Sequence, residues 1–155
     1  MTTLVTRARL LSTVLRTGDV RRIARLVERL EPRDVADVLP ALDHLDLRRM
    51  AAALCDEQHV DRTVNILDSN SLARLAMAAN PGDLVRLLRA LARADKEVAA
   101  ATLLTLPREA RGLALGKVDE VVRERLVRTL PRRARPKTSA DGLGAALRLR
   151  RLFAS

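Results

Sequence analysis

Apolar residues recur along this chain at spacings of three and four, the pattern of amphipathic helices. The stripes predict successive helices over residues 4–15, 20–30, 32–42, 45–54, 60–67, 72–76, 81–91, 95–106, 107–115 and 118–130. Pro40 falls inside the third stripe and should kink or end that helix near Leu39, because proline lacks the amide proton and clashes with the preceding turn. The pattern predicts an all-α protein.

One stretch of this pattern occurs twice. Residues 30–42 (LEPRDVADVLPAL) return as residues 79–91 (ANPGDLVRLLRAL), an offset of 49 residues, and Pro107 and Pro131 follow at about half that spacing. In both copies a proline opens the helix and an aspartate follows in its first turn, where it faces the positive end of the helix dipole. The repeat predicts short stacked helical units, which serve as binding scaffolds more often than as enzymes.

Composition supports helices and narrows the function. The 155 residues contain one aromatic, Phe153, and no Trp or Tyr. A core of small aliphatics suits close-packed helices, whereas a β-sandwich usually has aromatic and β-branched strands. The same shortage argues against aromatic ligand pockets and base-stacking platforms.

The net charge and the cysteine content indicate possible binding partners and the cellular compartment. The net charge of +10 comes from the two ends of the chain, while residues 31–130 are nearly neutral. Basic ends can attract nucleic acid, acidic protein or anionic lipid, or simply reflect an arginine-rich composition. Cys55 is the only cysteine, so an internal disulfide is excluded. No apolar run approaches a membrane-spanning length, and we expect a cytoplasmic protein.

The last part of the chain differs from the rest. Residues 131–139 hold two prolines and four basic residues without an apolar run, which predicts a linker. Leu143, Leu147, Leu149, Leu152 and Phe153 then predict a short amphipathic C-terminal helix. We therefore divide the chain into a helical domain over 1–130 and a basic linker with a helix over 131–155.

The Pro-x-Asp helices resemble one family. They are similar to the N-terminal cytosolic domain of MgtE-type magnesium transporters over roughly residues 18–130, and flagellar motor switch proteins of the FliG type share a comparable superhelix. The resemblance is carried by Leu30, Pro32, Asp34, Val35, Ala36, Asp37, Val38 and Leu39, and by Pro81, Asp83, Leu84, Leu87 and Leu88. It implies a right-handed superhelix of short stacked helices.

The resemblance also implies a function. In that family the domain precedes a CBS regulatory domain and a membrane domain, and Mg²⁺ bound by acidic residues between the cytosolic parts holds the pore closed. This chain shows neither of those domains, so we expect a non-enzymatic regulatory module whose protein partner is a separate CBS or membrane transporter component. Arginine occupies positions, such as Arg86, where the family is acid-rich.

Asp34, Asp37 and Asp83 are the residues we assign to Mg²⁺, the one cofactor implied. Asp34 and Asp37 lie three residues apart and share a helix face, and Mg²⁺ accepts one or two carboxylates when water supplies the other ligands. The simpler interpretation is that Asp34 and Asp83 complement helix dipoles and that Asp37 solvates a surface.

The sequence gives little support for a zinc site or for a catalytic site. Cys55 and His59 lie four residues apart, but a zinc site needs at least three protein ligands, so a buried structural thiol is the simpler interpretation of Cys55. The chain lacks GxSxG, HExxH, paired CxxC and phosphate-loop motifs, and we expect no enzymatic activity.

Basic residues supply the interaction candidates. These are Arg86 on the helical face and Arg132, Arg133, Arg148, Arg150 and Arg151 in the tail. The alternative functions are a nucleic-acid or an anionic-membrane adaptor acting through the basic termini, or a tail that only confers solubility. The shortage of aromatic residues argues against nucleic-acid binding, and a single amphipathic helix would bind a membrane only weakly. The sequence does not indicate the oligomeric state.

Overall fold

The computed structural model describes residues 2–17 and 19–135, and within these ranges the chain forms helices and no strand. The α-helices are α1 (Thr2–Arg16), α2 (Val20–Arg29), α3 (Pro32–Val38), α4 (His44–Leu54), α5 (Val60–Ile66), α6 (Ser69–Ala78), α7 (Pro81–Ala94), α8 (Lys96–Thr105), α9 (Arg108–Lys117) and α10 (Glu120–Thr129). Two short 3₁₀ helices are η1 (Leu39–Ala41) and η2 (Arg132–Ala134). The all-α prediction is confirmed, and the predicted helix over 141–153 lies outside the described residues.

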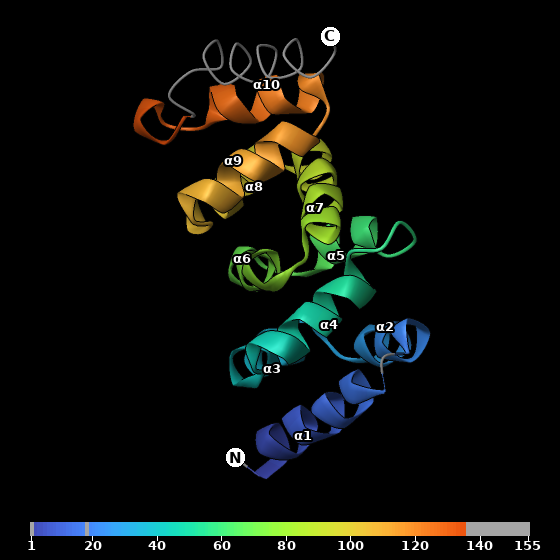
Figure 1. Ribbon diagram of the computed structural model, residues 1–155. Coiled ribbons are helices and arrows are strands. Elements are labelled where there is room, and N and C mark those ends of the chain that lie inside the picture. The colour runs from blue at the N-terminus through green and yellow to red at the C-terminus, as the bar shows by residue number, and fades with distance from the viewer. Residues whose placement is uncertain (1, 18, 136–155) are drawn as a thin grey trace, which may run out of the picture.

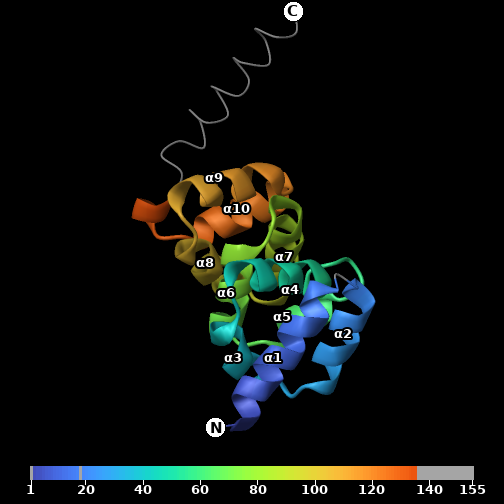
Figure 2. The ribbon, with the colours of Figure 1, turned by 60° about the horizontal axis from the view of Figure 1, so that its bottom comes forward.

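The helices follow one another from α1 at one end of the molecule to α10 at the other (Figure 1). Alternate helices contact each other, so that α2, α4, α6, α8 and α10 form one row and α5, α7 and α9 form a second. At the N-terminal end α1 contacts α2, α3 and α4, and Figure 2 shows it crossing between α2 and α3. Each helix therefore buries its apolar face mainly against near neighbours in the chain.

Most turns between helices consist of two extended residues. The first is an apolar C-cap with φ from −63° to −86° and ψ from 142° to 160°, namely Leu30, Leu42, Leu67, Ala79, Leu106, Val118 or Leu130. The second is a polar residue or proline that opens the next helix, as Asn80 does when its side chain accepts a hydrogen bond from the Asp83 amide at 2.9 Å. This turn reverses the chain without glycine and points the apolar C-cap side chain back into the core.

Pro40 has the predicted effect. α3 ends at Val38, and the chain continues as η1 from Leu39 to Ala41 before turning into α4. The buried side chains of Val35, Val38 and Leu39 remain on one side across this break, so the core is continuous.

The core consists of leucine and alanine, as the composition predicts. Fully buried leucines come from both ends of the stack, including Leu15 of α1 and Leu126 of α10. Alanines are fully buried among them, such as Ala51 and Ala53 of α4 and Ala99 of α8. Small side chains let helix axes approach closely, which explains how a chain with so few aromatics packs densely.

Candidate functional site

The structure places the three predicted magnesium ligands on two helices. Asp34 is half-buried in the first turn of α3 and Asp37 is exposed one turn later, whereas Asp83 is buried in the first turn of α7. Across the described part of the chain, no three His, Cys, Asp or Glu side chains are grouped closely enough to hold a metal ion. A magnesium site formed by Asp34, Asp37 and Asp83 stays a prediction.

Asp83 and Arg86 pair with each other. Arg86 Nη1 donates to Asp83 Oδ1 at 2.7 Å, and the Asp83 side chain is only 7% exposed. The second carboxylate oxygen, Oδ2, is buried without a hydrogen-bond partner in the protein. Burial raises the pKa of Asp83, against the opposing effect of Arg86, because the ionised form loses its hydration. Arg86 therefore forms an ion pair with the buried Asp83, although its own side chain is partly exposed.

Asp46 occupies the equivalent position of α4 and is equally buried. Its backbone amide is capped by Asp43, its Oδ2 accepts from Ser12 Oγ at 2.6 Å, and its Oδ1 accepts from Arg49 at 3.3 Å. Ser12 lies 34 residues away on α1, so the sequence analysis could not identify this pair. The bond ties α1 to α4 and is a structural contact.

Cys55 and His59 belong to no group of three potential metal ligands in the part of the chain that the structure describes. Cys55 is fully buried, and burial, reinforced by Asp83, raises its thiol pKa to about 12. His59 Nδ1 instead contacts Asp56 Oδ1 at 2.7 Å, on the turn between α4 and α5. A thiol with this pKa supplies almost no thiolate near neutral pH, so Cys55 is a packing residue, as its apolar surroundings in the sequence predicted.

The predicted interaction arginines divide into two groups. Arg132 and Arg133 are exposed on η2, while Arg148, Arg150 and Arg151 lie outside the described residues. The sequence analysis assigned no structure to 131–135, yet η2 forms there and Arg111 donates to the carbonyl of Ala134 at 3.3 Å. The hydrogen bond from Arg111 fixes η2 against the end of the helical stack.

Three other arginines cap helix C-termini, a role that the sequence analysis missed. Arg123 donates from Nε to Leu115 O at 2.7 Å and from Nη2 to the carbonyls of Gly116 and Val118, all at the end of α9. Arg111 does the same at the end of α8, and Arg135 at the end of α10. Their signal in the sequence is a spacing of twelve residues, each arginine standing five residues after an apolar C-cap.

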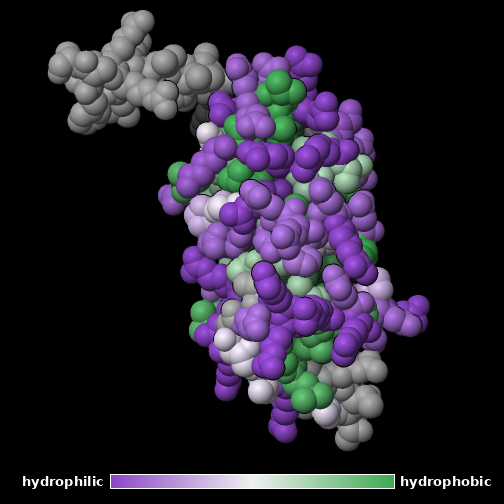
Figure 3. All heavy atoms as spheres, turned by 90° about the vertical axis from the view of Figure 1, so that its right-hand side faces the viewer, coloured by the Kyte–Doolittle hydropathy of each residue, from purple (hydrophilic) through white to green (hydrophobic). Residues whose placement is uncertain are grey.

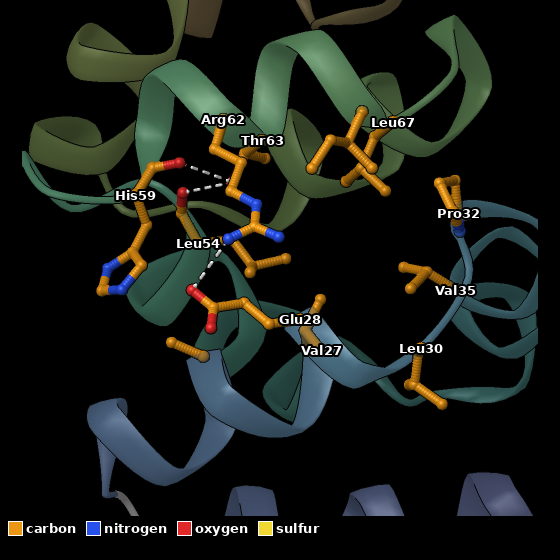
Figure 4. Close-up of a pocket in the computed structure, with 12 residues that line it drawn as sticks. Val27, Glu28, Leu30, Pro32, Val35, Leu54, His59, Arg62, Thr63 and Leu67 are labelled. Carbon is orange, nitrogen blue, oxygen red and sulfur yellow. Dashed lines mark hydrogen bonds and ion pairs between the residues drawn. The ribbon is translucent and has the colours of Figure 1, made fainter.

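An apolar groove lies between α2 and α5 (Figure 4). It has a volume of about 220 Å³ and is open to solvent. The apolar lining comes from four helices and the turns between them and includes Val27, Leu30, Pro32, Val35, Leu54, Ile66 and Leu67. The sequence analysis did not find the groove, because it depends on how α2 and α5 are placed.

Few polar groups line the groove. Arg62 of α5 reaches across to Glu28 of α2, with 3.3 Å between Nη1 and Oε1, and both side chains are about half exposed. Thr63 is occupied internally, since its hydroxyl donates to the carbonyl of Leu54 at 2.7 Å. Ile66 is 40% exposed at the groove edge. The groove is therefore a mainly apolar surface crossed by one solvent-exposed ion pair.

Comparison of the chain with protein-family models, curated proteins and solved structures gives no match. Among the described helices, none is long and apolar enough to cross a membrane. The function must therefore be argued from the geometry of the chain itself.

Proposed function

We propose that this chain is a non-enzymatic interaction module that docks another protein in the groove between α2 and α5. The observation that carries this proposal is an open apolar groove that is lined from four helices. Figure 3 shows that one face of the molecule is mostly hydrophilic, with apolar side chains in separate patches. An apolar groove edged by polar groups is typical of protein-binding sites.

The size of the groove favours apolar side chains of a protein over a small molecule. Small-molecule sites usually enclose about 300–1,000 Å³, whereas this groove has about 220 Å³ and is open along one side. Glu28 and Arg62 pair with each other, Thr63 donates to a backbone carbonyl, and Nδ1 of His59, which also lines the groove, contacts Asp56. A pocket of this kind suits one or two apolar anchor residues, which commonly dominate the energy of a protein interface.

The resemblance to MgtE-type N-terminal domains adds two points to the proposal: the stack is a right-handed superhelix, and docking responds to a divalent cation. Pro32 and Val35 of α3 line the groove, and Asp34 and Asp37 lie on the same short helix. Two carboxylates there could share a Mg²⁺ ion with a docked partner, since Mg²⁺ retains water in its remaining positions. In this proposal the cation strengthens docking.

The test uses a photoreactive amino acid at position 66, on the groove edge, and at position 121, an exposed apolar site on α10. We expect one discrete protein to cross-link at position 66 and not at 121. That protein is then purified and its affinity measured for the wild type, for Ile66→Gln and for the control Val121→Gln. Ile66→Gln should weaken binding about tenfold, the loss of one apolar anchor.

Two results would contradict the proposal. If the wild type and Ile66→Gln bind the partner with equal affinity, the groove is not part of the interface. An affinity that millimolar Mg²⁺ leaves unchanged in both the wild type and Asp37→Ala, relative to a Na⁺ control of equal ionic strength, removes the cation response while leaving docking intact.

A further inference from the structure

A row of arginines follows the edge of the α2–α5 groove. Arg21, Arg25 and Arg29 are exposed and spaced by four residues, so they form one line along α2. Glu28, which lines the groove, lies three residues from Arg25 and seven from Arg21 and therefore faces the same side. None of the three arginines forms an ion pair with another described side chain.

One of these charges is placed against the preference of the helix dipole, because Arg21 lies in the first turn of α2, whereas Arg29 in the last turn agrees with it. The first turn of α2 contains no acidic residue and holds Arg21 and Arg22, although the N-terminal end of a helix dipole is itself positive. Cations there destabilise a helix by about 0.3–1 kcal/mol each. The charge of Arg21 gains nothing from the helix dipole, and the three arginines together concentrate positive potential next to the groove.

The opposite edge of the groove carries a further cation. Arg62 of α5 pairs with Glu28 across the opening, and its side chain is 56% exposed. A carboxylate from outside could replace Glu28 as its partner at small cost, because exposed ion pairs contribute little. Both edges of an apolar surface are thus able to receive negative charge.

We propose that the partner segment bound in this groove is an amphipathic helix with acidic residues flanking its apolar face. This inference rests on the proposed docking function and names the chemistry of the partner. The apolar residues of that helix, at spacings of three and four, fill the groove. Its Asp or Glu residues face Arg21, Arg25 and Arg29, which extend about 12 Å along α2 at 1.5 Å per residue, the length of roughly two helical turns.

A protein helix explains both features of this site together. The phosphate backbone of a nucleic acid would use the arginines but leave the apolar groove unfilled, and the chain has no Trp or Tyr on which bases could stack. Charge complementarity next to an apolar anchor is the usual basis of specificity in helix-in-groove recognition.

The experiment measures fluorescence anisotropy of labelled designed peptides with the full chain. One peptide is an amphipathic helix with leucines at positions i, i+3, i+4 and i+7 and glutamates on both flanks, and its sister has lysines in place of the glutamates. We expect the glutamate peptide to bind the wild type at least about tenfold more tightly than the lysine peptide. The double variant R21E/R25E should reverse this preference, while the matched control R108E/R128E, on α9 and α10, should preserve it.

The remaining outcomes separate this inference from the proposed function. If both peptides bind equally and Ile66→Gln weakens both, the groove docks helices but the acidic preference is wrong. If Ile66→Gln leaves the affinity for both peptides unchanged, the groove is not the binding site, and both proposals fail. If R108E/R128E weakens binding as much as R21E/R25E, the attraction is only net charge, which also overturns the inference, as does the absence of binding by either peptide.

Discussion

Two buried aspartates show how surroundings decide the role of a residue. Asp46 and Asp83 occupy the same position in the first turns of α4 and α7, and each pairs with an arginine three residues later. Ser12 satisfies the second oxygen of Asp46, whereas Oδ2 of Asp83 has no such partner. An unsatisfied buried oxygen carries a desolvation cost, so Asp83 is where this core is most sensitive to protonation.

We expect the stability contributed by Asp83 to decrease as pH rises. Burial raises its folded-state pKa above the ordinary value of 3.8, so folding favours the protonated carboxyl. That contribution is complete below the unfolded-state pKa and is lost as pH rises through the folded-state pKa. Asp83→Asn keeps an acceptor for Arg86 and cannot ionise. Urea unfolding should therefore show the wild type losing free energy of unfolding relative to Asp83→Asn as the pH rises above the ordinary carboxyl pKa of 3.8. A pH-independent difference between the two proteins would contradict this expectation.

Three helices in this chain are capped at their C-termini by arginines that follow later in the sequence. The C-terminal carbonyls of α8, α9 and α10 lack partners within their own helices and are satisfied by Arg111, Arg123 and Arg135. A guanidinium has five N–H donors in a rigid planar fork and spans carbonyls that lie further apart than the compact ammonium group of lysine can span. Each arginine also fixes the angle of one two-residue turn, because it bonds across that turn.

Replacement of Arg123 tests this capping role. Arg123→Lys should lower the free energy of unfolding by about 1–2 kcal/mol, since one ammonium replaces a fork that reaches three carbonyls. The control is Arg125→Lys, an exposed arginine two residues away on α10, which should change stability by less than about 0.5 kcal/mol. Urea denaturation measures both. If the two variants behave alike, the capping hydrogen bonds do not contribute to stability.

The whole molecule is a row of local contacts with no single centre. Each helix packs against neighbours one, two or three positions away, and the terminal helices have neighbours on one side only. Stacks of this kind open from their ends, because the end units lose the fewest contacts. The groove between α2 and α5, crossed by the Arg62–Glu28 ion pair, is a further place where packing is incomplete.

Hydrogen exchange should therefore follow position in the stack. We expect amides of α4, α6 and α7 to exchange most slowly and those of α1 and α10 fastest. Leu126→Ala, which removes a fully buried side chain from α10, should accelerate exchange mainly in α8, α9 and α10. Exchange that instead accelerates equally in every helix would indicate one all-or-none unit. Hydrogen exchange measured by mass spectrometry under native conditions distinguishes opening from the ends of the stack from all-or-none unfolding.

The sequence alone predicted the elements of this fold. Apolar spacing identified the helices, Pro40 identified the break after α3, and the buried environment of Cys55 followed from its neighbours. These features depend on local chemistry, namely helical periodicity, proline geometry and apolar context, which a linear sequence contains.

Only the tertiary structure decided which residues meet. Ser12 reaches Asp46, Arg62 reaches Glu28, and α2 and α5 leave a groove between them, all over separations of more than thirty residues. Asp83 was recognised in the sequence as a dipole partner or a metal ligand, but its burial and its unsatisfied oxygen depend on packing. Such contacts are set by the angles of successive two-residue turns. Small differences in those angles accumulate along a stack and cannot be obtained from local patterns.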